Sequence, residues 1–146
     1  MELVDTGADF RFRHAVDVRF RDVDAMGNVH HSLPLIYFEE ARAAYWREVV
    51  GRETLADVDY TVGEVEVRFH ARILFPQRLT VGVRTTRLGE KSFTMEYVLW
   101  GEAGEVLTTG RTVLVMYDYA AGRTKRIPDA VRGRIEAWEA SPTARG

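Results

Sequence analysis

Two aspartates, one glycine and two adjacent histidines lie within the eleven residues Arg21–His31, whose sequence is RDVDAMGNVHH. The run follows a strand-like segment and precedes a long apolar segment with helical spacing. A carboxylate just before a helix can act as a nucleophile or a general base, beside backbone N–H groups that have no intrahelical acceptor. Such N–H groups stabilise negative charge that develops on a substrate oxygen. The motif therefore indicates chemistry on a polarised carbonyl group.

Either aspartate could instead shape the turn, because aspartate side chains accept hydrogen bonds from nearby backbone N–H groups. We assign that role to Asp22, and we assign catalysis to Asp24 because of its spacing to Gly27 and to the helix start. Gly27 allows a tight turn and lets a ligand approach the backbone. No metal site is expected, since adjacent histidines rarely point at one ion and no further ligand recurs at a metal-like spacing.

The segment after the motif is predicted to be one long helix. Apolar residues recur at intervals of three and four over residues 35–49. Ser32 is the expected N-cap, Pro34 is tolerated in the first turn, and Gly51 is the expected end. Before the motif, Val16–Phe20 alternates between apolar and charged residues, which predicts a half-buried strand.

After the helix, apolar residues recur at every second position, which predicts four amphipathic strands. They cover about residues 64–71, 79–83, 93–99 and 106–117. The glycine-containing links Leu88–Lys91 and Glu102–Glu105 have hairpin length, so the pairing is expected to be antiparallel.

The C-terminal part of the chain is predicted to contain a buried strand and a short helix. The dense apolar run Val113–Met116 predicts that the last strand is central and buried on both faces. A short helix is expected from Pro128, with Val131, Ile135 and Trp138 on one face.

These elements predict the α+β class, with a five-stranded antiparallel sheet wrapped around a long central helix and a short C-terminal helix. Residues 1–146 are expected to form a single domain, since no repeat, low-complexity tract or linker interrupts them. An open sheet edge beside so much apolar surface favours self-association.

Composition excludes several classes of function. Twenty basic and twenty-two acidic residues give a net charge of -2, so nucleic acid is not an expected partner. The absence of cysteine removes disulfides, thiolate metal ligands and a cysteine nucleophile, and it fits a reducing compartment. The N-terminus resembles no targeting signal, and no apolar run approaches the roughly 20 residues that span a bilayer. A soluble, cytoplasmic protein without a membrane partner is expected.

The chain resembles the hotdog-fold acyl-CoA thioesterases of the 4-hydroxybenzoyl-CoA thioesterase family. The similarity covers about residues 14–117 and rests on the order of the elements together with four motifs. These are Asp22–Gly27, VHH at Val29–His31, YFEEAR at Tyr37–Arg42 and LGEKSF at Leu88–Phe93. The resemblance implies hydrolysis of acyl-CoA or aroyl-CoA thioesters, without a metal or organic cofactor. It also implies a homodimer or a dimer of dimers, which would be a homotetramer, with active sites at the dimer interface.

The resemblance assigns roles within the motif. The second aspartate is catalytic in that family, which implies that Asp24 is the nucleophile or the general base. The amide seven residues later contacts the thioester oxygen, and here it belongs to His31, whose ring matches an auxiliary histidine in several members. Gly27, Val29 and His30 are expected to line the substrate site.

The sequence departs from the family pattern at two places in this region. Phe20 replaces a tyrosine of some bacterial acyl-CoA members, and Asn28–His31 replaces the His-Val-Asn-Asn of other members. Any role of that tyrosine hydroxyl is therefore absent.

The phosphates of coenzyme A need basic side chains at the mouth of the site. Lys91 matches a basic residue that contacts coenzyme A in the aromatic-CoA branch, and Arg87 is close in sequence. Gly89 and Glu90 replace arginines of that branch, however. The second candidate is the cluster Arg123, Lys125 and Arg126, although each of these residues could be an ordinary solvated charge.

Other polar and aromatic residues have simpler interpretations. Glu39 and Glu40 are expected to face solvent with a salt link to Arg42. Core positions are expected for Tyr37, Tyr45 and Trp46, and surface positions for His14 and His70.

Three rival functions remain on the same scaffold: a dehydratase, an acyl-carrier-protein thioesterase and a non-enzymatic acyl-CoA-binding module. The dehydratase is disfavoured because the Asp-x-Asp-x-x-Gly run is characteristic of the hydrolases.

Overall fold

The computed structural model describes residues 4, 6, 9–52, 54 and 57–140. The described elements follow one another along the chain in an order close to that predicted. They are β1 (Phe12–Asp17), η1 (Phe20–Asp22), α1 (Leu33–Glu48), β2 (Tyr60–Phe69), β3 (Arg78–Leu88), β4 (Ser92–Trp100), β5 (Val106–Asp118), β6 (Arg123–Thr124) and α2 (Asp129–Glu139).

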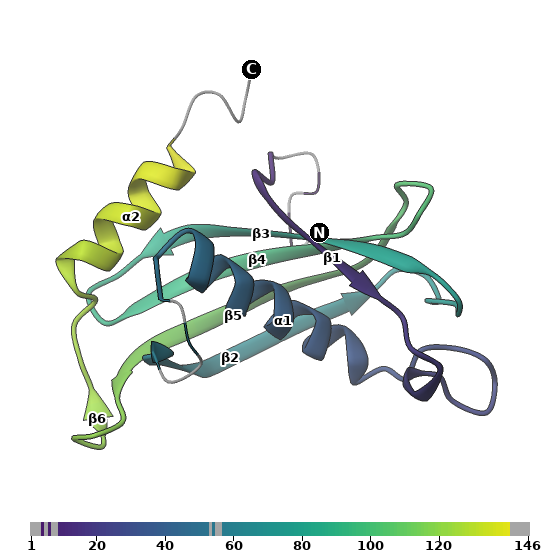
Figure 1. Cartoon of the computed structure of the whole chain (residues 1–146), viewed down its shortest axis with the longest axis horizontal. Coiled ribbons are helices and arrows are strands. Elements are labelled where there is room, and N and C mark those ends of the chain that lie inside the picture. The colour runs from purple at the N-terminus through teal and green to yellow at the C-terminus, as the bar shows by residue number, and fades with distance from the viewer. Residues whose placement is uncertain (1–3, 5, 7–8, 53, 55–56, 141–146) are drawn as a thin grey trace.

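The strands form one antiparallel sheet in the order β1-β3-β4-β5-β2, and the two-residue strand β6 pairs with β5. Helix α1 runs along one face of this sheet, and α2 lies near the C-terminal end of α1 (Figure 1). The sheet, the long helix and the short C-terminal helix confirm the predicted α+β hotdog fold. Both hairpin links are also confirmed, since they join β3 to β4 and β4 to β5.

The core lies between α1 and the sheet. The helix buries Tyr37, Phe38, Tyr45 and Trp46, so the predicted core aromatics are confirmed. The Trp46 ring stacks on Phe93 with centroids 5.4 Å apart, and the Phe38 ring stacks on Tyr97 at 4.8 Å. A Cβ atom at Gly110 would lie 2.6 Å from the Phe38 ring, so only glycine lets the helix pack this closely on β5.

Both ends of α1 lie close to their predicted positions. Ser32 is the N-cap residue and Pro34 lies in the first turn, but the Ser32 hydroxyl makes no capping hydrogen bond to the helix. Gly51 has φ +87°, and its N–H donates to the carbonyl of Arg47 at 3.2 Å. A glycine in the left-handed region after the last turn is a common way for a helix to end.

The first strand lies earlier than predicted. The expected strand Val16–Phe20 overlaps β1 only at Val16 and Asp17. Val18 is still buried, but residues 20–22 form a 3-10 turn that leaves the Phe20 side chain 77% exposed. The turn forms because the Asp22 carboxylate accepts a hydrogen bond from the backbone N–H of Arg19 at 3.0 Å. This side-chain bond offers the backbone an alternative to the strand ladder.

The last long strand is only partly buried on both faces. It lies one strand in from the β2 edge. Residues 107–110 are all buried, whereas buried and half-buried residues alternate from Arg111 onward. Val113 and Val115 are half-buried, so the prediction for Val113–Met116 was wrong there, because α1 covers only one face of the sheet (Figure 1).

Helix α2 confirms the C-terminal prediction. Val131 and Ile135 are buried in the main core, and Trp138 packs against it. The guanidinium of Arg11 lies 3.9 Å from the centroid of the Trp138 ring. Within the described residues, no helix is long and apolar enough to cross a membrane.

Strand β2 forms an open edge of the sheet. Among the described elements it pairs only with β5. Its apolar side chains Val62, Val65 and Phe69 are 42%, 45% and 52% exposed, and Ile36 on the neighbouring helix is also 52% exposed. A long edge strand with exposed apolar side chains is a template for pairing with another chain.

Candidate functional site

The predicted motif forms a loop between β1 and α1 (Figure 1). Its first aspartate, Asp22, is buried and structural, as predicted. The Asp22 carboxylate accepts hydrogen bonds from the N–H of Arg19 and from the Tyr37 hydroxyl at 2.7 Å. Burial, followed by the hydrogen bond to Asp22, raises the pKa of Tyr37 well above its ordinary value. The hydroxyl therefore stays protonated and joins the loop to the second turn of α1.

Asp24 occupies the tip of this loop, and its side chain is exposed. One carboxylate oxygen, Oδ1, accepts the N–H of Met26 at 2.8 Å and the N–H of Asn28 at 3.2 Å. The backbone of the turn is closed by the Asp24 N–H, which donates to the Asn28 carbonyl, and by Gly27 with φ +80°. The orientation of this carboxylate is thus fixed through one oxygen. Oδ2 makes no hydrogen bond among the described residues.

The two histidines follow directly. Their rings stack with centroids 4.2 Å apart, and both side chains are exposed. Nδ1 of His30 lies 2.9 Å from the Ser32 hydroxyl and accepts the Ser32 N–H at 3.2 Å. The backbone N–H of His31, next to the first turn of α1, has no hydrogen-bond acceptor within the described part of the chain. An N–H at this place is available to a substrate oxygen.

A cavity of about 310 Å³ opens beside the loop. Asn28, Val29 and His31 line it from the loop, and Phe69 and His70 line it from the end of β2. The motif thus brings five of the predicted site residues together at one end of the sheet. These are Asp24, Gly27, Val29, His30 and His31.

The predicted coenzyme A contacts lie elsewhere. Arg87 is the second-last residue of β3, and Lys91 lies in the turn to β4. The loop that contains Asp24 follows β1, whose last residue pairs with Arg78 at the start of β3. Arg78 and Leu88 are ten residue steps apart along β3, which corresponds to about 33 Å at 3.3 Å per step. Within one chain the structure does not bring Lys91 and Arg87 to Asp24.

The second basic cluster lies on the same end of the sheet as Lys91. The Nζ of Lys125 contacts the Asp59 carboxylate at 2.9 Å, and Arg52 contacts the same oxygen at 3.2 Å. Lys125 therefore has a structural partner. Arg126 is exposed and lies 3.9 Å from Glu90, and Arg123 is exposed on β6.

The two glutamates of α1 have different partners. Glu39 contacts Arg42 at 3.8 Å, as expected, but Glu40 contacts His14 at 2.7 Å. His14 is half-buried, and this contact with the exposed Glu40 lies at the surface between β1 and α1. His70 is exposed, as predicted, and its Nε2 lies 2.8 Å from the Thr109 hydroxyl.

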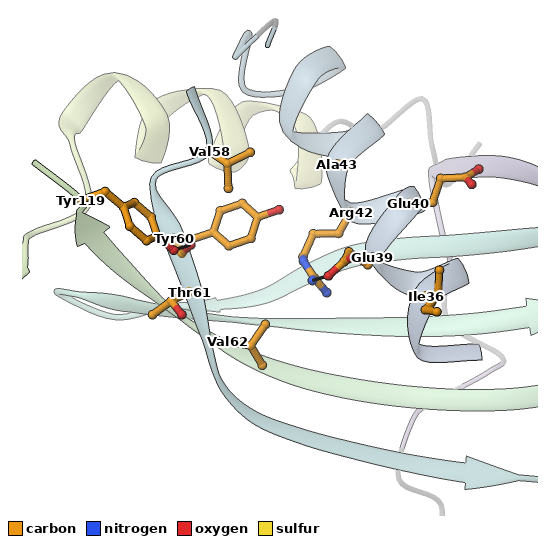
Figure 2. Close-up of a pocket in the computed structure, with 10 residues that line it drawn as sticks. All are labelled: Ile36, Glu39, Glu40, Arg42, Ala43, Val58, Tyr60, Thr61, Val62 and Tyr119. Carbon is orange, nitrogen blue, oxygen red and sulfur yellow. Dashed lines mark hydrogen bonds and ion pairs between the residues drawn. The ribbon is translucent and has the colours of Figure 1, made fainter. Parts of the chain in front are cut away.

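Arg42 differs most from its prediction. It is 5% exposed, and it points into a cleft of about 560 Å³ between α1 and β2 (Figure 2). From the sequence it was expected only as the salt-link partner of the solvent-facing Glu39 and Glu40. A signal was available, since Arg42 lies four residues after Phe38 and four before Trp46, which puts all three on one face of the helix.

No cluster of three or more His, Asp or Glu side chains that could bind a metal ion is found in the described ranges.

Comparisons with known proteins agree on one family. Residues 18–135 match the family model described as the thioesterase-like superfamily. A crystal structure of a thioesterase from Thermus thermophilus, complexed with coenzyme A and Zn, is 37% identical with a TM-score of 0.82, over 92% of this chain and 98% of that one. The PA5185 protein of Pseudomonas aeruginosa strain PAO1 is 26% identical with a TM-score of 0.78, over 88% and 92% of the two chains. The uncharacterized protein YsmA of Bacillus subtilis (strain 168) is 27% identical over 114 residues, which is 78% of each protein.

Proposed function

This chain belongs to the thioesterase-like superfamily and is a thioester hydrolase, and we propose that it hydrolyses acyl-CoA thioesters to the free acid and CoA. The coenzyme A complex of the Thermus thermophilus relative supports this choice of carrier. The observation on which the proposal rests is the Asp24 carboxylate, oriented by two backbone N–H groups on the loop that leads into α1.

Asp24 is the proposed catalytic group. With Oδ1 engaged by Met26 and Asn28, Oδ2 is the oxygen that reacts. It can attack the thioester carbonyl, so that the thiolate leaves and water then cleaves the resulting anhydride. Alternatively it takes a proton from a water molecule that attacks the same carbon. Both routes end in the same acid and thiol.

The backbone N–H of His31 is the proposed donor to the thioester oxygen. Its free hydrogen and its place before α1 make it suited to stabilise the negative charge of the tetrahedral intermediate. The exposed His31 ring is an auxiliary group in this proposal, and Gly27, Val29 and His30 complete the lining of the site.

A homodimer formed along β2 would complete the site. A second copy that pairs antiparallel with β2 about its middle puts the Tyr60 end of one strand beside the Phe69 end of the other. It would also cover the exposed side chains of Val62 and Val65. Self-pairing explains why a long apolar edge stands open in a single chain.

This dimer would also join the separated parts of the site. Because the two-fold operation reverses the sheet, Lys91 and Arg87 of one copy come to the end where the other copy has Asp24. They are then placed to bind the phosphates of coenzyme A. The pairing of two dimers into a homotetramer, the 4-hydroxybenzoyl-CoA branch and a cytoplasmic location are further parts of the proposal.

A panel of aliphatic and aromatic CoA thioesters, with matched acyl-carrier-protein thioesters, tests the proposal. We expect hydrolysis of CoA thioesters by the wild-type protein and its loss in Asp24→Asn, with Asp17→Asn, at an exposed position of β1, as the matched control. Preference for the carrier protein would favour the acyl-carrier-protein thioesterase instead. Tight binding without turnover in any variant would contradict the proposed reaction.

A further inference from the structure

The cleft between α1 and β2 contains a buried cation. Figure 2 shows the guanidinium of Arg42 beside Glu39, with Tyr60 and Val62 on the facing strand. The cleft has a volume of about 560 Å³, within the range of pockets that bind small molecules. Arg42 is 5% exposed although it lines this opening.

The guanidinium faces the hydroxyls of Tyr97 and Tyr60 and the Glu39 carboxylate, and its five N–H donors still outnumber these partners among the described residues. Its Nη1 donates to the Tyr97 hydroxyl at 3.2 Å, and that hydroxyl also bonds Thr112 at 2.7 Å. Nη2 is 3.8 Å from the Glu39 carboxylate, whose side chain is 69% exposed. Nε is buried and has no hydrogen-bond partner in the described part of the chain. A guanidinium offers five N–H donors, and a buried charge without full pairing is costly.

The walls around this cation are mostly apolar. Ile36, Ala43, Val58 and Val62 line the cleft together with the ring of Tyr60. Such walls suit the hydrocarbon part of a small aliphatic or aromatic group, while the guanidinium suits an oxygen at its far end.

We propose that this cleft receives the end of the acyl group remote from the thioester, and that Arg42 donates hydrogen bonds to an oxygen there. The substrates are then thioesters of acids that end in an acceptor oxygen, as a carboxylate or a hydroxyl, rather than in a plain alkyl chain. This inference rests on the proposed function, because the cleft adjoins the reacting carbonyl only across the β2 dimer.

The two kinds of oxygen use the cleft differently. A carboxylate accepts two N–H bonds from the guanidinium and displaces Glu39 toward solvent, where that side chain is already exposed. A hydroxyl accepts from Arg42 and donates to Glu39, so that both side chains stay in place. In both cases the substrate oxygen accepts hydrogen bonds from the Arg42 guanidinium.

Binding of stable CoA thioethers tests the inference without turnover. Three analogues of equal chain length end in methyl, hydroxyl or carboxylate, and their dissociation constants are measured by calorimetry. We expect at least one oxygen-ended analogue to bind the wild-type protein tenfold or more tightly than the methyl analogue. Tighter binding of the hydroxyl or of the carboxylate analogue supports the inference. The analogue with the lower dissociation constant shows which of the two groups the cleft prefers.

Two variants locate the effect. Arg42→Met should remove the discrimination between oxygen and methyl, whereas Arg47→Met, on the exposed side of the same helix, should preserve it. Equal or tighter binding of the methyl analogue by the wild type overturns the inference even if Arg42→Met does not fold. Failure of all three analogues to bind also overturns it.

Hydrolysis of the corresponding thioesters separates this inference from the proposed function. Asp24-dependent hydrolysis that is equal for the three chain ends would refute the inference and leave the reaction standing. Discrimination among the thioethers without hydrolysis of any thioester would refute the proposed reaction and leave the ligand class standing.

Discussion

Two hydrogen bonds at the Asp24 carboxylate and one from Tyr37 to Asp22 determine the shape of the loop that contains the proposed catalytic group. The first aspartate is buried and structural, and the second is exposed at the tip. The same residue type therefore has two different environments. The motif spacing predicted the structural role of Asp22, and the catalytic role of Asp24 stays a proposal.

Loss of the Tyr37 hydroxyl should weaken the loop. Tyr37→Phe leaves the buried Asp22 carboxylate with one donor fewer, at a cost of about 2 kcal/mol in the free energy of unfolding. Urea denaturation measures this loss. Tyr117→Phe is the control, because the Tyr117 hydroxyl makes no hydrogen bond among the described residues. An equal loss in both variants would contradict the role of the Asp22–Tyr37 bond.

Arg42 shows where residue-level reasoning stopped. A charged residue on a helix is usually solvated, and that general expectation outweighed its spacing to Phe38 and Trp46. Only the structure shows that Tyr97, on β4, meets it beneath the helix.

At the scale of elements, one acidic side chain of α2 contacts both the sheet and α1, in addition to the apolar packing of this helix. The Glu139 carboxylate accepts the Tyr45 hydroxyl at 2.6 Å and the N–H of Thr85 at 2.8 Å. Burial raises the pKa of Glu139 above its ordinary value, although these two hydrogen bonds act in the opposite direction. The folded protein therefore binds a proton here more tightly than the unfolded chain does.

This shift predicts how stability depends on pH. Because the folded pKa is the higher one, the contribution of Glu139 is fully present below the unfolded pKa and is lost as pH rises through the folded pKa. Glu139→Gln removes the titration. The stability of the wild type relative to this variant should therefore fall as pH rises above about 4, near the ordinary pKa of glutamate.

Denaturation at several pH values measures that difference. Glu136→Gln, at an exposed position of α2, is the matched control for the removal of one carboxylate from this helix. A wild-type advantage that grows with pH for Glu139 would contradict the account of α2 docking.

Most elements were predictable because their periods are strong. Apolar residues recur about every 3.6 residues along α1 and every second residue along the strands β2 to β5. The end of β1 was misplaced because the alternation of apolar and charged residues continues through Val18 to Phe20, whereas the hydrogen bond from Arg19 N–H to the Asp22 side chain forms a turn there. Strand β6 has two residues, too few for any period to detect.

At the scale of the whole molecule, the strand order is β1-β3-β4-β5-β2. The strands β1 and β2, which precede and follow α1 in the sequence, therefore lie at opposite edges of the sheet. Periodicity contains no information on this order, so the distance between Asp24 and Lys91 could not be predicted from the sequence. The same order leaves β2 as the edge that the proposed dimer would use. Whether the chain is one domain throughout stays a prediction.

A charge at the middle of β2 should prevent the dimer. Val65→Lys places an ammonium where the proposed interface buries an apolar side chain, so size-exclusion chromatography with light scattering should show one chain in place of two or four. Hydrolysis should fall on the order of a hundredfold, because the site loses the parts supplied by the partner.

The opposite edge supplies the matched control. Ala15→Lys adds the same charge at an exposed position of β1 and should leave both mass and activity unchanged. A Val65→Lys protein that is a fully active single chain would exclude a shared site.

The central claim is that the Asp24 carboxylate performs the chemical step rather than binding the substrate. Single-turnover hydrolysis of the best CoA thioester, with enzyme in excess, measures that step directly, and a thioether analogue measures binding. We predict that Asp24→Asn binds the analogue as the wild type does but reacts at least about a hundredfold more slowly. A single-turnover rate within a few-fold of the wild type would contradict the account.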